Sequence, residues 1–323
     1  MAHQQLDPSA PSDVITVVVR HHDLVADGVV GLELERTDAA QFPHWDPGAH
    51  IDLVLPDGTE RQYSLCGDPA NRSRWQLGVL LEPNGRNGSR QVHSDIEVGS
   101  VLQVRGPRNH FRWVAGVRYQ FIAGGIGITP IVPMLRAAQA AGAEWSLAYS
   151  GRSLSTMAFH RELTAAYGAR VRLFPADTGA RVDLAQLCAE QAPDTLVFCC
   201  GPARLLDAVD ALDWPNGPAR TERFFALDPG AREPNESFEI ELGLSGLTLT
   251  VPPEQTIVEV VEAAGILVIS SCREGTCGTC ETPVISGEVD HRDSVLTPDE
   301  QADNAVMMIC VSRSLCPRLV LEL

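Results

Sequence analysis

Four cysteines near the end of the chain have a spacing that suits a metal–sulfur centre. Cys272, Cys277 and Cys280 form a C-x4-C-x2-C motif, and Cys310 follows after 29 further residues. A plant-type [2Fe–2S] cluster takes three thiolates from one tight loop and a fourth from elsewhere, with this spacing. A four-cysteine zinc site is the alternative, but such sites usually combine two close cysteine pairs. The spacing therefore favours a [2Fe–2S] cluster, and with it one-electron transfer.

A second group of residues combines phosphate-binding and ring-stacking side chains. Arg61 can pair with a phosphate, and Tyr63 faces the same side of a strand and can stack on a ring. The adjacent Ser64 can reach a ring heteroatom with its hydroxyl or its backbone N–H. An ordinary surface strand is the alternative interpretation of this segment. Further along, a glycine-rich turn offers N–H groups and a hydroxyl to a phosphate through Gly85, Gly88 and Ser89.

A second glycine-rich turn, GGIGITP at 124–130, follows a strand pattern and precedes a helical one. The N–H groups at the start of a helix can bind a dinucleotide phosphate. This motif is not the G-x-G-x-x-G of Rossmann folds, and a purely structural turn is the alternative. The candidate ligands in this turn are Gly124, Gly125, Gly127 and Thr129.

Two further candidate ligand-binding segments lie at the ends of predicted strands. Arg152 and Ser153 lie where the ribose of an adenosine is expected, and an arginine with a serine there can bind a 2′-phosphate. Cys200, Gly201 and Pro202 end the last strand of the same region, where open parallel sheets bind their ligands.

The hydrophobic pattern divides the chain into three regions that would position these residues. From Val14 to about Val114, short β-rich runs alternate with turns, which indicates a small barrel or sandwich. From about residue 117, strands alternate with helical stretches, which indicates a parallel, doubly wound α/β sheet. A linker-like segment at 228–236 precedes renewed strand patterns from Phe238 and a helical stretch at 257–264. We therefore expect three compact units.

The composition excludes several kinds of chemistry. All 25 basic residues are arginine, so the chain lacks the lysine needed for a Schiff base, a pyridoxal phosphate linkage or a Walker A loop. The 42 acidic residues bring the net charge to −17, which argues against general nucleic-acid binding. The sequence has no apolar run that would span a membrane and no signal-peptide pattern at its start. We therefore expect a cytoplasmic protein.

Together these motifs resemble those of the phthalate dioxygenase reductase family, which includes the vanillate demethylase reductases. Residues 61–64 match the flavin motif of the ferredoxin reductase superfamily, and residues 124–130 match its nicotinamide-binding turn. The family usually has a further glycine where Asn87 stands. The resemblance covers the whole chain and implies a multidomain fold: an antiparallel β-barrel flavin domain at 1–115, a doubly wound NAD(P)-binding α/β domain at 116–228, a linker at 229–236 and an α+β (β-grasp) ferredoxin domain at 237–323.

The resemblance also implies roles for individual residues. Arg61 and Ser89 would hold the terminal phosphate of FMN, with FAD as the alternative. The family mostly uses NADH, whereas the arginine and serine at 152–153 would favour NADPH, and we expect NADH. Cys200 would lie beside the nicotinamide, and the aromatic residue of the Glu-Arg-Phe motif would cover the flavin ring. The candidate catalytic residues are thus Ser64, Cys200 and Phe224.

The function implied by the resemblance is that of a reductase component. Such a protein takes a hydride from NADH to a flavin and passes single electrons through a [2Fe–2S] cluster to a terminal oxygenase, here a Rieske non-haem iron hydroxylase or demethylase. A cytochrome P450 partner is one alternative, and a zinc-bearing binding protein is an alternative of another class. The ferredoxin-like segment carries 14 acids and four arginines, so its surface either docks a basic oxygenase or serves solubility. The family default is a monomer.

Overall fold

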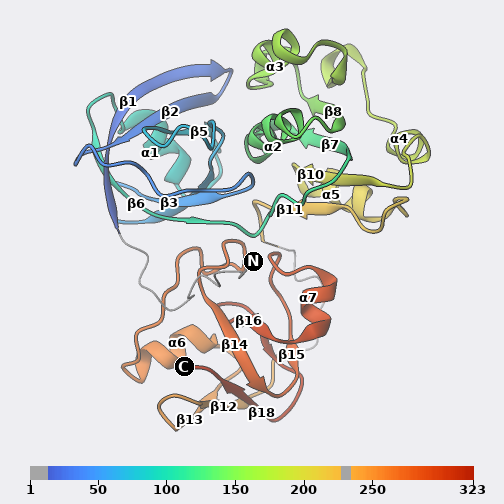
Figure 1. The fold of residues 1–323 in the computed structure, drawn as a ribbon. Coiled ribbons are helices and arrows are strands. Elements are labelled where there is room, and N and C mark those ends of the chain that lie inside the picture. The colour runs from blue at the N-terminus through green and yellow to red at the C-terminus, as the bar shows by residue number, and fades with distance from the viewer. Residues whose placement is uncertain (1–13, 227–233) are drawn as a thin grey trace.

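The computed structural model of the chain describes residues 14–226 and 234–323 and contains three main sheets, one in each expected region (Figure 1). Residues 1–13 and 227–233 lie outside the described part, and they include most of the linker expected at 229–236. In the view of Figure 1 the first two units lie side by side, and the third lies below them.

The first unit is an antiparallel barrel. Its sheet has the strand order β4-β3-β6-β1-β2-β5, and a bridge between Leu65 and Leu77 joins its two outer strands. The short helix α1 (Gly88–Ser94) follows the first glycine-rich turn. Alternate strand residues such as Val17, Val19 and Leu34 are fully buried, because successive side chains point to opposite faces of a strand. The strands are β1 (Ile15–Ala26), β2 (Val29–Arg36), β3 (His50–Val54), β4 (Glu60–Ser64), β5 (Trp75–Leu80) and β6 (Val101–Arg108).

The second unit is a parallel five-stranded sheet with helices on both faces. Its strand order is β11-β10-β7-β8-β9, so the order reverses between β7 and β10, where open α/β sheets bind ligands. The elements are β7 (Arg118–Gly124), η1 (Gly125–Gly127), α2 (Ile128–Ala140), β8 (Glu144–Gly151), α3 (His160–Tyr167), β9 (Val171–Pro175), α4 (Leu184–Ala189), β10 (Thr195–Cys200), α5 (Ala203–Asp210) and β11 (Arg220–Glu222).

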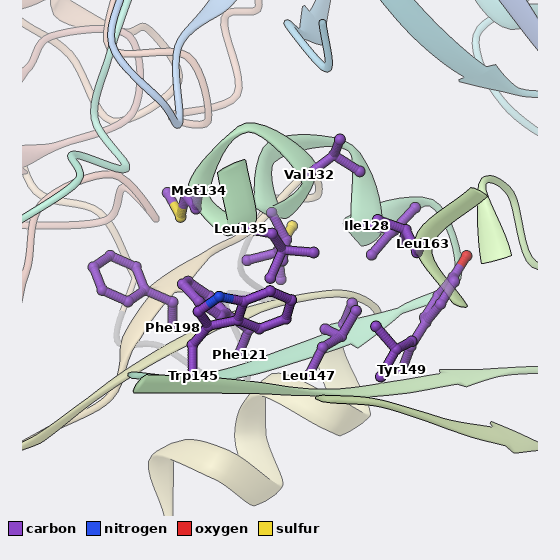
Figure 2. Close-up of a cluster of buried hydrophobic side chains, with 14 of the residues drawn as sticks. Phe121, Ile128, Val132, Met134, Leu135, Trp145, Leu147, Tyr149, Leu163 and Phe198 are labelled. Atoms are coloured by element: carbon purple, nitrogen blue, oxygen red, sulfur yellow. The ribbon is translucent and has the colours of Figure 1, made fainter. Parts of the chain in front are cut away.

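Helix α2 is fixed on the sheet by an apolar core, and this fixes the glycine-rich turn that precedes it. Figure 2 shows α2 above the sheet, with Ile128 and Leu135 between the helix and the strand residues and Val132 on the side of the helix away from the sheet. Burial of each such side chain contributes about 1.5–3 kcal/mol. The strand residues in this core include Phe121, Trp145, Leu147, Tyr149 and Phe198.

The third unit is an α+β fold whose sheet has the order β13-β12-β18-β14-β16, with β12 and β18 parallel. Helix α6 (Ile257–Ala263) begins with a capping box between Thr256 and Glu259 and buries its apolar face in the core of this unit. The loop with three of the four cysteines connects α6 to β14. The other elements are β12 (Phe238–Leu242), β13 (Leu247–Val251), β14 (Glu281–Ser286), β15 (Val289–Asp290), α7 (Pro298–Asp303), β16 (Val306–Met308), β17 (Arg313–Ser314) and β18 (Arg318–Leu321).

The longest helix of the described ranges, α2, has 13 residues. Among the helices in these ranges, none is both long and apolar enough to cross a membrane.

Candidate active site

One cavity of about 450 Å³ is lined by residues of all three units. Its lining in the first two units includes eight residues that the sequence singled out, namely Arg61, Tyr63, Ser64, Gly85, Gly88, Ser89, Thr129 and Phe224. Glu222 of the second unit lines it as well, and so do Glu274 and Thr276 of the third. We call this space the flavin cavity. The three units therefore meet at a single potential ligand site.

Strand β4 brings polar groups to this cavity. Burial raises the pKa of Tyr63 to about 12, so its hydroxyl stays protonated beside the ring-binding space. The hydroxyl of Ser64 is buried and has no hydrogen-bond partner among the described residues. A buried polar atom without a partner is costly, and a flavin ring would supply the missing partner. The residues present therefore fit a flavin.

The sequence analysis missed His50, which also lines the flavin cavity. Its ring is buried, and its Nε2 lacks a partner within the described ranges. The β3–β4 ladder pairs His50 with Ser64 across the turn at Pro56-Asp57-Gly58. That pairing could have been inferred from the turn signal, because antiparallel register across a hairpin follows from the turn.

The first glycine-rich turn packs around the Arg61 side chain. Arg61 Nη2 donates to the carbonyl of Arg86 at 2.7 Å. A Cβ on Gly88 would lie 2.5 Å from two atoms of Arg61, so the close approach requires glycine. Asn87 has φ 64°, a left-handed conformation that asparagine tolerates. The turn therefore offers backbone N–H groups and one guanidinium to a phosphate.

A second cavity, of about 740 Å³, lies at the switch point of the parallel sheet. A Cβ on Gly127 would lie 2.3 Å from the carbonyl oxygen of Cys200, so glycine lets η1 approach the end of β10. We call this space the nucleotide cavity. Of the residues that the sequence singled out, Gly124, Gly125, Gly127, Arg152, Gly201, Pro202 and Phe224 line it.

Three of the expected nucleotide ligands, Thr129, Ser153 and the fully buried Cys200, do not line this cavity. Thr129 lines the flavin cavity. The hydroxyl of Ser153 caps a short 3-10 helix and lies 3.2 Å from Thr156 Oγ1. Two arginines that the sequence analysis missed, Arg181 and Arg204, line the nucleotide cavity instead.

The two cavities share five lining residues: Leu80, Glu82, Ile126, Phe224 and Phe225. Behind this junction Cys200 is fully buried, and its Sγ lies 3.9 Å from Glu222 Oε2. Burial raises the pKa of Glu222 to about 8, and burial together with Glu222 raises the pKa of the Cys200 thiol well above its usual value. Both groups are therefore protonated near pH 7 at the place where two ligands would meet.

The four cysteines of the third unit are buried together. Hydrogen bonds from the Cys277 and Cys310 thiols hold the pKa of Cys272 below its usual range. Backbone N–H groups of Glu274 and Thr276 also point at it, at 3.3 and 3.5 Å. Cys310 in turn contacts the Cys280 thiol. This donor set fits a cluster of thiolate-bound irons.

In residues 14–226 and 234–323, no three His, Cys, Asp or Glu side chains converge as they would around one metal ion. A binuclear cluster does not require such convergence, because each iron takes two of the four thiolates.

The cysteine loop docks on the barrel beside the flavin cavity. Arg86 Nη2 lies 2.8 Å from Glu274 Oε2, and Gln62 Nε2 donates to Ser271 Oγ at 2.8 Å. Two histidines of the first unit also lie at this contact, His50 buried and His110 half-buried. Burial and the nearby Arg108 lower the pKa of His50 to about 3 and that of His110 to about 4, so both rings are neutral at pH 7.

The fold and the convergent sites define a flavin- and nicotinamide-dependent reductase with its own [2Fe–2S] domain. Residues 240–315 match a family model described as a 2Fe-2S iron-sulfur cluster binding domain. The vanillate O-demethylase oxidoreductase of Pseudomonas sp. (strain HR199 / DSM 7063) is 38% identical over 318 residues, which are 96% of this chain and all of that protein.

Two solved structures are similar as well. Phthalate dioxygenase reductase matches with a TM-score of 0.70 and 35% identity, over 96% of this chain and 98% of that one. An intact type IV self-sufficient cytochrome P450 monooxygenase matches with a TM-score of 0.90 and 41% identity, over 96% of this chain and 41% of that one. This chain belongs to the phthalate dioxygenase reductase family. The fold class expected from the sequence is confirmed.

Proposed function

We propose that this protein takes a hydride from NADH to FMN and delivers single electrons through its [2Fe–2S] cluster to a terminal oxygenase. One observation carries the proposal: the flavin cavity shares five lining residues with the nucleotide cavity and is also lined by Glu274 and Thr276 of the cysteine loop. A ligand in this cavity would contact the entry site for two electrons and the exit site for one. A bound flavin supplies the conversion between the two.

The chain's own residues hold and orient the groups. Arg61 and the turn at 85–89 bind the flavin phosphate, because together they offer a guanidinium, backbone N–H groups and the Ser89 hydroxyl. Tyr63 would stack on a bound flavin ring, and the Ser64 hydroxyl, which lacks a partner among the described residues, would hydrogen-bond to it. Phe224 covers the ring at the junction of the cavities and excludes water there. The raised pKa of Glu222 keeps its carboxyl protonated beside the Cys200 thiol, so the wall of the junction on the nicotinamide side is uncharged.

Two features support FMN and NADH. The Arg86–Glu274 ion pair lies beside the phosphate-binding turn, where the adenosine part of FAD would have to continue. The capping role of Ser153 leaves Arg152 without the serine partner that a 2′-phosphate site would use. We also propose the domain boundaries given above, with the flavin domain ending near residue 115 and the ferredoxin domain beginning near residue 237.

The partner we propose is an oxygenase of the Rieske non-haem iron type, because the relatives reported above are named for an O-demethylase and a dioxygenase. The acidic surface of residues 237–323, with its net charge of −10 from 14 acids and four arginines, suits a basic docking site on that partner. A cytochrome P450 is the second candidate, since a self-sufficient P450 contains a module 41% identical to this chain. We propose that the reductase itself acts as a monomer in the cytoplasm.

An anaerobic titration of the purified protein with NADH, and separately with NADPH, tests this function. The flavin and cluster absorption bands should bleach with NADH at much lower concentration than with NADPH. Mass spectrometry of the released flavin should give the mass of FMN. A colourless protein that contains zinc would refute the proposal.

Reconstitution with a purified Rieske oxygenase and with a P450 decides between the partners. The transfer rate to the true partner should fall as ionic strength rises, because docking of oppositely charged surfaces is screened by salt. A rate that does not change with salt would rule out docking by charge.

A further inference from the structure

His50 has one side on the flavin cavity. It is the first residue of β3, its side chain is 6% exposed, and its Nε2 has no partner among the described residues. A buried ring nitrogen without a partner is rare in a native protein and costs stability unless a bound group supplies the missing hydrogen bond. His50 lines the cavity with Ser64, its neighbour in the β3–β4 ladder, whose hydroxyl also lacks a partner in that part of the chain.

The other side of the His50 ring faces the cysteine loop. The backbone of Cys277 interacts with the ring, and the ring of His110 lies 6.1 Å away between centroids, tilted by 30°. His110 packs directly on the loop, because a Cβ on Gly278 would lie 2.0 Å from His110 Nε2. The two imidazoles therefore fill the space between the flavin cavity and the segment from Cys277 to Cys280.

We propose that His50 is a positioning residue that hydrogen-bonds to the flavin through Nε2 and, with His110, seats the Cys277–Cys280 segment against the flavin cavity. The inference rests on the proposed function and adds the residues that fix the two redox sites relative to each other. In the transfer that they would support, the two electrons of the hydride would pass from a bound flavin to the cluster one at a time, and its proton would be released to solvent.

Variants of the full-length protein separate the two parts of the proposal. Binding of FMN to the deflavinated protein, followed by flavin fluorescence quenching, reports the contact of His50 with the flavin. His50→Ala should weaken FMN binding about tenfold, as expected for the loss of one hydrogen bond in a buried site. His50→Gln places an amide near the position of Nε2 and should restore most of this affinity. His21→Ala, at an exposed histidine on β1, is the matched control and should leave the affinity unchanged.

The seating of the cysteine loop is measured by stopped-flow spectroscopy. After mixing with NADH, His110→Ala should delay bleaching of the cluster band relative to the flavin band by about tenfold, because the loop loses its packing surface. The cluster should still assemble, with unchanged absorption and electron paramagnetic resonance signals.

Three results bear on the inference. FMN affinity of His50→Ala equal to that of the unmodified protein overturns the flavin contact, and cluster bleaching in His110→Ala at the original rate overturns the seating of the loop. If His50→Ala does not fold, His50→Phe, which keeps a ring but has no ring nitrogen, takes its place: it should show the same loss of FMN affinity, and an unchanged affinity overturns the flavin contact. Failure of NADH to reduce the flavin in the unmodified protein would refute the proposed function instead.

Discussion

Arg86 Nη2 lies 2.8 Å from Glu274 Oε2, so an ion pair joins the turn beside the flavin cavity to the loop that carries three cluster cysteines. The backbone of the same arginine accepts a hydrogen bond from Arg61, and its Nη1 lies 3.5 Å from the Cys272 carbonyl. The two side chains are 54% and 40% exposed, so the pair contributes about 0–1 kcal/mol to docking. Its larger effect is on phosphate binding in the flavin cavity, because the Glu274 carboxylate competes with a bound phosphate for the Arg86 guanidinium.

Glu274→Gln should tighten FMN binding about two- to fivefold, because the carboxylate no longer competes with the flavin phosphate for Arg86. Flavin fluorescence quenching with the deflavinated protein measures the dissociation constant. Riboflavin, which lacks the phosphate, is the control ligand, and its affinity should stay the same. The gain for FMN should shrink in 0.5 M NaCl because salt screens exposed charges. An equal gain for riboflavin would show that the variant acts through packing.

Much of the barrel side of the flavin cavity could be predicted from short motifs, because many of its lining residues come from one strand and one turn. Arg61, Tyr63 and Ser64 are neighbours on β4, and the alternation of a strand determines which of them share a face. The place of His50 in the cavity could have been predicted in a similar way, because the register of the β3–β4 hairpin pairs it with Ser64.

The docking of the cysteine loop was not predictable from the sequence. Arg86 and Glu274 are 188 positions apart and belong to separately folded units, so no local periodicity relates them. Contacts between units depend on the shapes of two finished surfaces. The capping role of Ser153 could not be predicted either, because a serine after a strand can serve as a ligand or as a helix cap and the sequence does not distinguish the two.

Cys310→Ser should abolish electron transfer beyond the flavin. The sulfur of Cys310 is buried against those of Cys272 and Cys280, and a serine hydroxyl is a poor ligand for the irons. The purified variant should lose the broad cluster absorption and reduction of the oxygenase, while NADH-dependent reduction of ferricyanide continues at the flavin. Cys316→Ser, at a half-exposed cysteine outside the motif, is the matched control and should retain the cluster. An intact cluster in Cys310→Ser would refute the assignment of this ligand.

Gly127→Ala should damage the nucleotide site. The new Cβ would lie 2.3 Å from the Cys200 carbonyl oxygen and 2.6 Å from the Gly201 nitrogen, and backbone atoms cannot move aside cheaply. We expect a loss of about 1–3 kcal/mol in stability, together with a several-fold higher KM for NADH. Thermal unfolding and steady-state ferricyanide reduction measure the two effects.

Gly142→Ala is the control for that substitution. Gly142 has φ +68° and open space around the position of a Cβ, so the variant strains the backbone without touching the site. Its KM for NADH should not change. An equal rise in KM for both variants would mean that the rise comes from the lower stability of the whole protein and not from local crowding at Gly127.

Alkylation should distinguish the cysteines outside the cluster. Partial burial acts to raise the pKa of Cys316, but hydrogen bonds to its sulfur from the Ser314 hydroxyl and the Glu288 amide outweigh this, and its pKa is lowered. Burial raises the pKa of Cys66 to about 12 and that of Cys200 well above the usual value. Because the thiolate is the reactive form, brief iodoacetamide treatment at pH 7.5 should label Cys316 first. Peptide mass spectrometry reads the order, and early labelling of Cys200 would contradict its burial.

Glu222→Gln should remove a pH dependence of stability. Burial raises the pKa of this carboxyl from 4.5 to about 8 in the folded protein, against the opposing effect of the nearby Cys200 thiol. Below about pH 4.5 the side chain is protonated in both the folded and the unfolded state. Between pH 4.5 and about 8 the unfolded chain ionises while the folded one does not, so this residue's contribution to stability is lost as pH rises through that window.

Thermal unfolding of the deflavinated protein at several pH values from 5 to 8.5 measures this loss. The melting temperature of Glu222→Gln relative to the unmodified protein should rise steadily with pH, because glutamine cannot ionise and has nearly the same shape. Ferricyanide reduction by the flavin-loaded variant then shows whether the junction of the cavities needs an ionisable group or a hydrogen-bonding one. A difference in melting temperature that stays constant from pH 5 to 8.5 would mean that Glu222 ionises in the folded protein as readily as in the unfolded chain.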